Sequence, residues 1–182
     1  MNKKRIWLVI PSVLFPYCVL FGLAIIFFSS KYSFFECIME QVFRGNAWYL
    51  VAALLVVGIL SIILSIICFC KSTREGWDAR SLAKTAMITK LIQVPAYVLI
   101  FFWGVLLAIT IFTIPFSLGL FLFDCLTLVA TGLITTASAI IAIRQRIFTF
   151  KESFWVIVLQ VVFCADVVAS IIYFMALRKK YK

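Results

Sequence analysis

Five long apolar stretches dominate this sequence and restrict its fold more than any other feature. Crossing the hydrocarbon core of a bilayer takes roughly 20 mostly apolar residues, because an α-helix rises about 1.5 Å per residue and the core is about 30 Å thick. Residues 6–29, 47–70, 91–113, 116–143 and 153–176 all meet this requirement. The sequence therefore predicts five membrane-spanning helices.

The composition supports a membrane location. The chain is 65% hydrophobic and 13% charged, whereas soluble domains are about 45–50% apolar and about 25% charged. Residues 50–67 carry no polar side chain except two serines, which fits a helix and not the alternating pattern of a barrel strand. We therefore expect an all-α, polytopic membrane protein with residues 1–182 in a single five-helix bundle. A secreted disulfide scaffold, a disordered chain and a soluble enzyme are excluded.

The distribution of Lys and Arg predicts the orientation. With five crossings, the side that holds the N-terminus receives 11 basic residues and the other side receives 6. Cytoplasmic loops carry the excess of Lys and Arg, so the N-terminus is expected in the cytoplasm. A re-entrant last segment would change the count to 15 and 2. We still favour five crossings, because the last stretch is long enough to cross and late charges have less influence on orientation.

The same basic loops explain the net charge of +10. Lys and Arg beside helix ends attract anionic lipid headgroups, at about 1 kcal/mol each. The expected partners are the lipid bilayer, its anionic headgroups and a membrane or cytoplasmic protein, with no nucleic acid. Richness in Ile, Phe and Lys, without a eukaryotic targeting sequence, favours a multi-pass protein of the bacterial plasma membrane.

Several local features refine this picture. Residues 81–93 are expected either to lie along the membrane interface or to continue the third span below it. The loop of residues 30–46 predicts a short amphipathic helix on the outer surface. Pro11 and Pro16 fall within the first stretch and predict a kink, whereas Pro95 and Pro115 border the third.

Two acidic residues fall inside predicted spans, Asp124 and Asp166. A charge at mid-membrane costs at least about 2.5–3.5 kcal/mol, so such residues usually face the bundle interior or a cavity. Both lie about 12–15 Å from the outer ends of neighbouring antiparallel spans, and they could face each other. No Lys, Arg or His falls within a predicted span to neutralise them. We therefore expect a protonated carboxyl or a bound cation at this pair.

Polar residues follow both aspartates at helical spacing, which places them on the same helix faces. The candidate proton or cation site comprises Asp124, Asp166, Thr127, Thr131, Thr135, Ser170 and Tyr173. The ordinary alternative is that these groups hydrogen-bond neighbouring helices together.

Metal and catalytic sites receive little support. The chain has no histidine, no C-x-x-C pair, and none of the common hydrolase, metalloprotease, P-loop or dinucleotide motifs. A mixed site of Cys18, Cys125 and Cys164 beside the aspartates is a less favoured metal alternative, because buried thiols mostly act as small hydrophobes. We expect no cofactor and no catalytic residue.

These features favour a small transporter-like protein or a transport-accessory subunit with a proton- or cation-responsive aspartate pair. The competing class is a non-catalytic membrane interaction protein in which the aspartates are interhelical hydrogen-bond partners. An intramembrane enzyme is third. Transport requires a water-accessible cavity at an aspartate, whereas the competing class requires carboxyls buried against protein partners.

Overall fold

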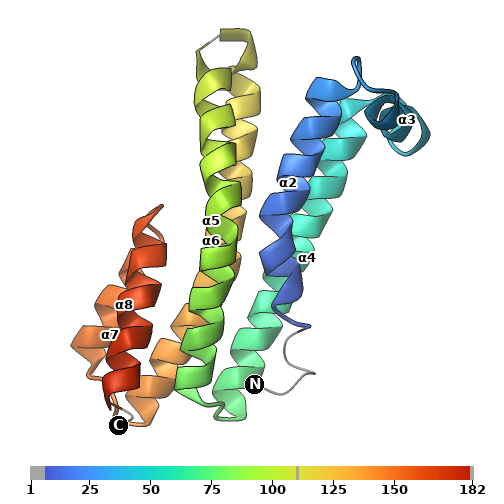
Figure 1. Ribbon diagram of the computed structural model, residues 1–182. Helices are drawn as coiled ribbons and strands as arrows, with labels where there is room; N and C mark the ends of the chain where they lie inside the picture. The colour runs from blue at the N-terminus through green and yellow to red at the C-terminus, as the bar shows by residue number, and fades with distance from the viewer. Residues whose placement is uncertain (1–6, 110, 181–182) are drawn as a thin grey trace.

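The structure is a computed structural model that describes residues 7–109 and 111–180, and all regular structure in these ranges is helical (Figure 1). This confirms the all-α prediction. The helices are α2 (Ile10–Phe28), α3 (Ser33–Gln41), α4 (Ala47–Arg74), α5 (Ala79–Ala108), the 3-10 helix η1 (Ile111–Thr113), α6 (Ile114–Arg144), α7 (Phe150–Leu159) and α8 (Ala165–Lys180).

Four of these helices are long and apolar enough to cross a membrane: α2, α4, α5 and α6. They correspond to the first four predicted spans, and α6 packs extensively against both α4 and α5. Figure 1 shows them running up and down as one elongated bundle. The chain thus has the architecture of a multi-span membrane protein.

The fifth predicted span, residues 153–176, is not a single helix. It is divided between α7 and α8, which are 10 and 16 residues long and fold back on each other as a hairpin. Cys164, in the turn between them, has a φ of +67°. Residues other than glycine rarely adopt this backbone conformation. Figure 1 shows this C-terminal hairpin beside only the lower part of α5 and α6. The finding matches the re-entrant alternative and provides no fifth crossing.

The hairpin places the end of α8 at the end of the bundle where α2 begins (Figure 1). We call this the basic end, because ten of the described Lys and Arg residues lie in or beside the helix ends there. They are Lys71, Arg74, Arg80, Lys84, Arg144, Arg146, Lys151, Arg178, Lys179 and Lys180. The opposite end, which carries α3, has Lys31 and Arg44 among its described residues.

Helix α5 begins twelve residues before the predicted third span. Asp78 starts it as the N-cap, and its carboxylate accepts a hydrogen bond from the Ser81 N–H at 2.9 Å. The helix then continues without interruption to Ala108. Residues 81–93 thus belong to the same helix as the predicted third span, which agrees with the continuation alternative, and they do not form a separate helix.

The α2–α4 contact depends on small and polar side chains. The Ser12 hydroxyl lies 2.9 Å from that of Ser65 and 3.2 Å from that of Ser61. A Cβ atom at Gly58 would lie 2.7 Å from the ring of Phe15, so only glycine allows this approach. Small residues and interhelical hydrogen bonds of this kind are how helices associate in lipid, where apolar burial gives little driving force.

Pro16 lies inside α2, as predicted. Because proline has no N–H, the carbonyl of Ser12, four residues earlier, loses its helical partner. The Gln93 amide of α5 donates to this carbonyl at 2.6 Å and so replaces the missing bond. Two other prolines differ from the prediction: Pro11 occupies the first turn of α2, and Pro95 lies within α5 instead of bordering it.

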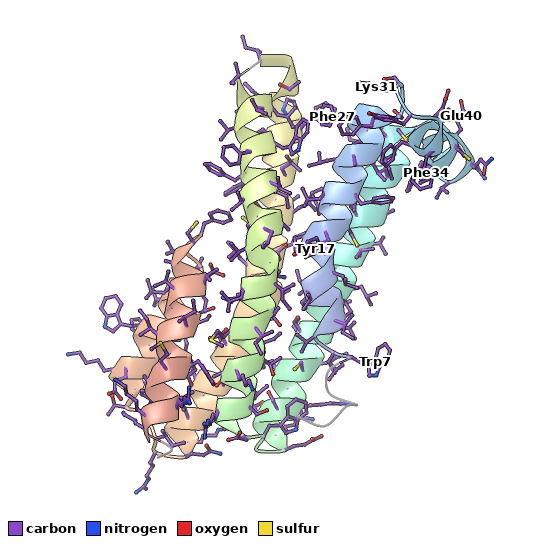
Figure 2. All side chains as sticks on the ribbon, in the orientation of Figure 1. Trp7, Tyr17, Phe27, Lys31, Phe34 and Glu40 are labelled. Carbon is purple, nitrogen blue, oxygen red and sulfur yellow. The ribbon has the colours of Figure 1, made fainter. Side chains whose placement is uncertain are left out.

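The predicted short helix in residues 30–46 is present as α3. None of its residues is buried in the bundle, and Figure 2 shows Phe34 and Glu40 at the α3 end, near Lys31. Phe35 contacts the rings of Phe28 and Tyr32, which holds α3 to the end of α2.

The re-entrant hairpin predicts that the end of α8 and the start of α5 are exposed on the same side of the membrane. In sealed vesicles, an impermeant maleimide should label Lys179→Cys and Arg80→Cys from one side and the native Cys37 of α3 from the other. Labelling of Lys179→Cys from the same side as Cys37 would instead establish a fifth crossing.

Candidate functional site

The most polar feature inside the bundle is an ion pair between Lys90 of α5 and Asp166 of α8. The Lys90 ammonium lies 2.9 Å from Asp166 Oδ2, and the two side chains are 0% and 1% exposed. Lys90 also donates a hydrogen bond to the side-chain oxygen of Gln160, the residue after α7. Lys90 is 11 residues from the start of α5, so this site lies about 16 Å in from the basic end.

The break between α7 and α8 is what brings Gln160 and Asp166 to the same lysine. In an unbroken helix, six residues would separate them by about 9 Å along the axis and by about 120° around it. Their side chains could not then converge on one ammonium. The reversal of the chain removes this separation, and it also places Asp166 in the first turn of α8. Negative charge is favoured there, because the N–H groups at the start of a helix are unpaired.

The remaining polar groups near the ion pair bond within the protein. The Tyr97 hydroxyl lies 3.4 Å from Gln93 Oε1, and Ser170 donates to the Asp166 carbonyl at 2.8 Å. Tyr173 lies 3.3 Å from the Ser138 hydroxyl. Ser138 in turn donates to the Ala79 carbonyl at 2.7 Å, which joins α6 to the start of α5. These polar groups are thus paired with groups of the protein itself.

The threonine face predicted on α6 is buried, with Thr127, Thr131 and Thr135 each no more than 1% exposed. Thr127 and Thr131 donate to carbonyls four residues earlier in α6, at 2.9 and 3.0 Å. The Thr135 hydroxyl is buried without a hydrogen-bond partner among the described residues. These residues share one helix face, as predicted, but two of the three hydroxyls are satisfied by their own helix.

Asp124 occupies a different environment from Asp166. Its Oδ1 atom is buried and has no hydrogen-bond partner in the described part of the chain. It lines a small cavity between α5 and α6, whereas Asp166 lines a separate one. The structure therefore provides each carboxyl with its own surroundings, and a shared role of the two as one proton or cation site stays a prediction.

The statement that no basic residue lies within a span is wrong. The predicted third span begins at Leu91, where the continuous apolar run begins, and so leaves Lys90 in the loop before it. The N-cap at Asp78 shows that the helix starts well before that run. Recognising Asp78 as a cap would have placed Lys90 inside the helix, but nothing in the sequence identifies Asp166 as its partner.

The cavity next to Asp166 is apolar. It has a volume of about 520 Å³ and lies between α5 and the tip of the C-terminal hairpin. Its lining includes Val94, Val98, Phe101 and Phe163. Asp166 is among the lining residues, and its side chain, which is 1% exposed, is paired with Lys90.

The structure does not support the alternative of a metal site at Cys18, Cys125 and Cys164. Across residues 7–109 and 111–180, no group of three or more His, Cys, Asp or Glu side chains is placed to hold a metal ion. Cys18 and Cys125 are partly buried, Cys164 is exposed, and all three are free thiols.

A second ion pair closes the base of the C-terminal hairpin. Glu152, in the first turn of α7, forms a capping box with the N-cap residue Thr149, whose N–H donates to Glu152 Oε2 at 2.9 Å. The Lys180 ammonium of α8 lies 3.2 Å from the same oxygen. The Thr149 N–H and hydroxyl, and then Lys180, hold the pKa of Glu152 below its ordinary value of 4.5.

Comparisons with protein-family models, with curated proteins and with solved structures gave no match for this chain.

The buried ion pair predicts strong coupling between Lys90 and Asp166. Lys90→Met or Asp166→Leu alone should lower the free energy of unfolding by about 3–5 kcal/mol, because each leaves an unpaired charge inside the bundle. The double variant should lose much less than the sum. Lys84→Met, at an exposed position of the same helix, is the control and should change stability by less than about 0.5 kcal/mol. Additive effects in a double-mutant cycle, measured by denaturation in detergent, would contradict the pairing.

The Glu152 contacts predict a pH-dependent contribution from the hairpin base. Because the folded-state pKa is below 4.5, wild-type protein should melt above Glu152→Gln at pH 6. This advantage should disappear as the pH falls through the lowered pKa and the carboxylate is protonated. Thermal melting between pH 3 and 7 measures the difference. A constant difference across this range would show that the charge of Glu152 is not the cause.

Proposed function

We propose that this protein is a non-catalytic membrane interaction protein, such as an accessory subunit, that acts by binding another membrane protein. The observation that carries this proposal is the Lys90–Asp166 ion pair. An intramembrane aspartate with a free carboxylate is typical of ion pathways, but a lysine of the same chain already neutralises this one. The pair therefore has the role of fixing the C-terminal hairpin to α5.

The surroundings of the carboxyls support this choice over transport. The cavity beside Asp166 is lined mainly by valine and phenylalanine, whereas an ion or proton pathway needs polar groups that water can reach. Asp124 and Asp166 also line different cavities, so a coupled aspartate pair is not supported by their placement.

The framework also suits a binding role. Among the described residues, only α3 and the short turns lie outside the bundle that the four long helices and the C-terminal hairpin form. Large apolar side chains such as Val56, Phe102 and Phe121 are 61–67% exposed on the bundle surface. Lipid covers such a surface in part, and another membrane protein can bind to it through shape and interhelical polar contacts.

We further propose that the basic end faces the cytoplasm of a bacterial plasma membrane. Ten of the described Lys and Arg residues lie at this end and two at the α3 end, and cytoplasmic segments carry the excess of positive charge. The ten also offer a surface to anionic lipid headgroups.

The proposal predicts no ion movement by the purified protein. In proteoliposomes with a pH-sensitive or cation-sensitive dye inside, wild-type protein should give the same flux as protein-free vesicles, while an added ionophore verifies the dye response. A flux that is lost in Asp124→Asn or in Asp166→Asn would contradict the proposal and support the transporter class.

The complementary expectation concerns assembly. After mild detergent extraction from its native membrane, the protein should migrate on a native gel as a complex larger than the purified chain in the same detergent. Identical migration of the two samples would count against a binding role.

A further inference from the structure

Asp124 is the one acidic residue of the four long helices that has no ion-pair or hydrogen-bond partner for its buried Oδ1 atom among the described residues. It lies ten residues from the start of α6, about 15 Å in from the α3 end. Its Oδ1 atom is enclosed and forms no hydrogen bond with any described residue. The residue as a whole is only partly buried and lines a surface groove. A group from outside the chain can therefore reach the carboxyl and stabilise it, and an unpaired acceptor is costly in lipid.

Asp124 lines a groove of about 220 Å³ between α5 and α6. On α5, the groove is lined by Gly104 and Ala108, which are four residues apart and so lie on one face. A Cβ atom at Gly104 would meet nothing within 4 Å, so the backbone is uncovered at this point. Two small residues at this spacing allow another helix to approach closely. Phe101 and Phe121 flank the groove and are 55% and 67% exposed.

We propose that this groove binds a transmembrane helix of a partner protein that presents a lysine or arginine to Asp124. The inference rests on the proposed binding function and adds its site and the chemistry of the partner. The argument for a basic partner is charge complementarity: a carboxylate within the hydrocarbon is stabilised most by an opposite charge at the same depth.

Two other occupants fit less well. A second copy of this chain would bring Asp124 against Asp124, or would need a free cation at this depth. Lys90 is fully buried and already paired with Asp166, and the other described basic residues lie near the two ends of the bundle. A lipid amine is attached at the headgroup level, whereas Asp124 is about 15 Å inward.

The test uses the full chain in phosphatidylcholine vesicles, with an acceptor dye fused after its C-terminus. Donor-labelled, leucine-rich transmembrane peptides carry either one lysine or a leucine about 15 Å from the end that aligns with α3. Energy transfer, titrated against peptide concentration, gives the association constant. The lysine peptide should associate about tenfold more tightly than the leucine peptide, as expected for an interhelical polar contact.

Three variants locate the interaction. Asp124→Asn, which keeps the side-chain shape, should remove the preference for lysine. Gly104→Leu should fill the groove and weaken association about tenfold without a change in charge. Gly119→Leu is the matched control: its glycine is equally open but belongs to α6 and lines a different cavity, so association should not change.

Equal association of the lysine and leucine peptides with wild-type protein would overturn the proposal. An unchanged lysine preference in Asp124→Asn would do the same, as would an equal effect of Gly104→Leu and Gly119→Leu. If Asp124→Asn does not fold, the glycine pair decides the question. Failure here leaves the general binding role intact, because that role is tested separately by ion flux and by complex size.

Discussion

The ion pair between Lys90 and Asp166 is the contact on which the arrangement of the C-terminal region depends. Both groups are almost fully buried, and either one alone would be an uncompensated charge inside the membrane. Together with Gln160, they join α5 to both arms of the C-terminal hairpin. This explains why the last apolar segment turns back: Gln160 and Asp166 can reach one lysine only if the helix is interrupted between them.

The same requirement accounts for other contacts in the bundle, because polar groups within a bilayer have to be satisfied by the protein itself. Gln93 replaces the hydrogen bond that Pro16 removes from the Ser12 carbonyl, and Tyr17 of α2 donates to the Ile92 carbonyl near Pro95 of α5. Figure 2 shows Tyr17 at the boundary between these helices. Asp124 departs from this pattern, because its buried Oδ1 atom has no hydrogen-bond partner among the described residues. The groove that it lines is therefore the surface where we expect a partner from outside the chain.

The apolar runs were sufficient to predict the helical class, the first four spans and the helix α3, because length and hydropathy decide which segments can cross a membrane. They could not predict the break at residues 160–164, which contain no glycine or proline. Its cause is tertiary: the polar residues on either side of the turn contact Lys90, 70 and 76 positions earlier in the chain. The sequence draws attention to Asp124 and Asp166 because both fall within apolar runs. The partner of Asp166 depends on long-range packing, which the sequence does not reveal.

The most direct test of this account is the contact between Lys90 and Asp166 in a lipid bilayer. Solid-state NMR of the full chain, labelled at the Lys90 amine with ¹⁵N and at the Asp166 carboxyl with ¹³C, measures the dipolar coupling between these two atoms. The account predicts a measurable coupling, because a 2.9 Å contact between Lys90 Nζ and Asp166 Oδ2 also holds the carboxyl carbon close to the nitrogen. The absence of coupling between them would show that the last segment is held in another way and would contradict the account.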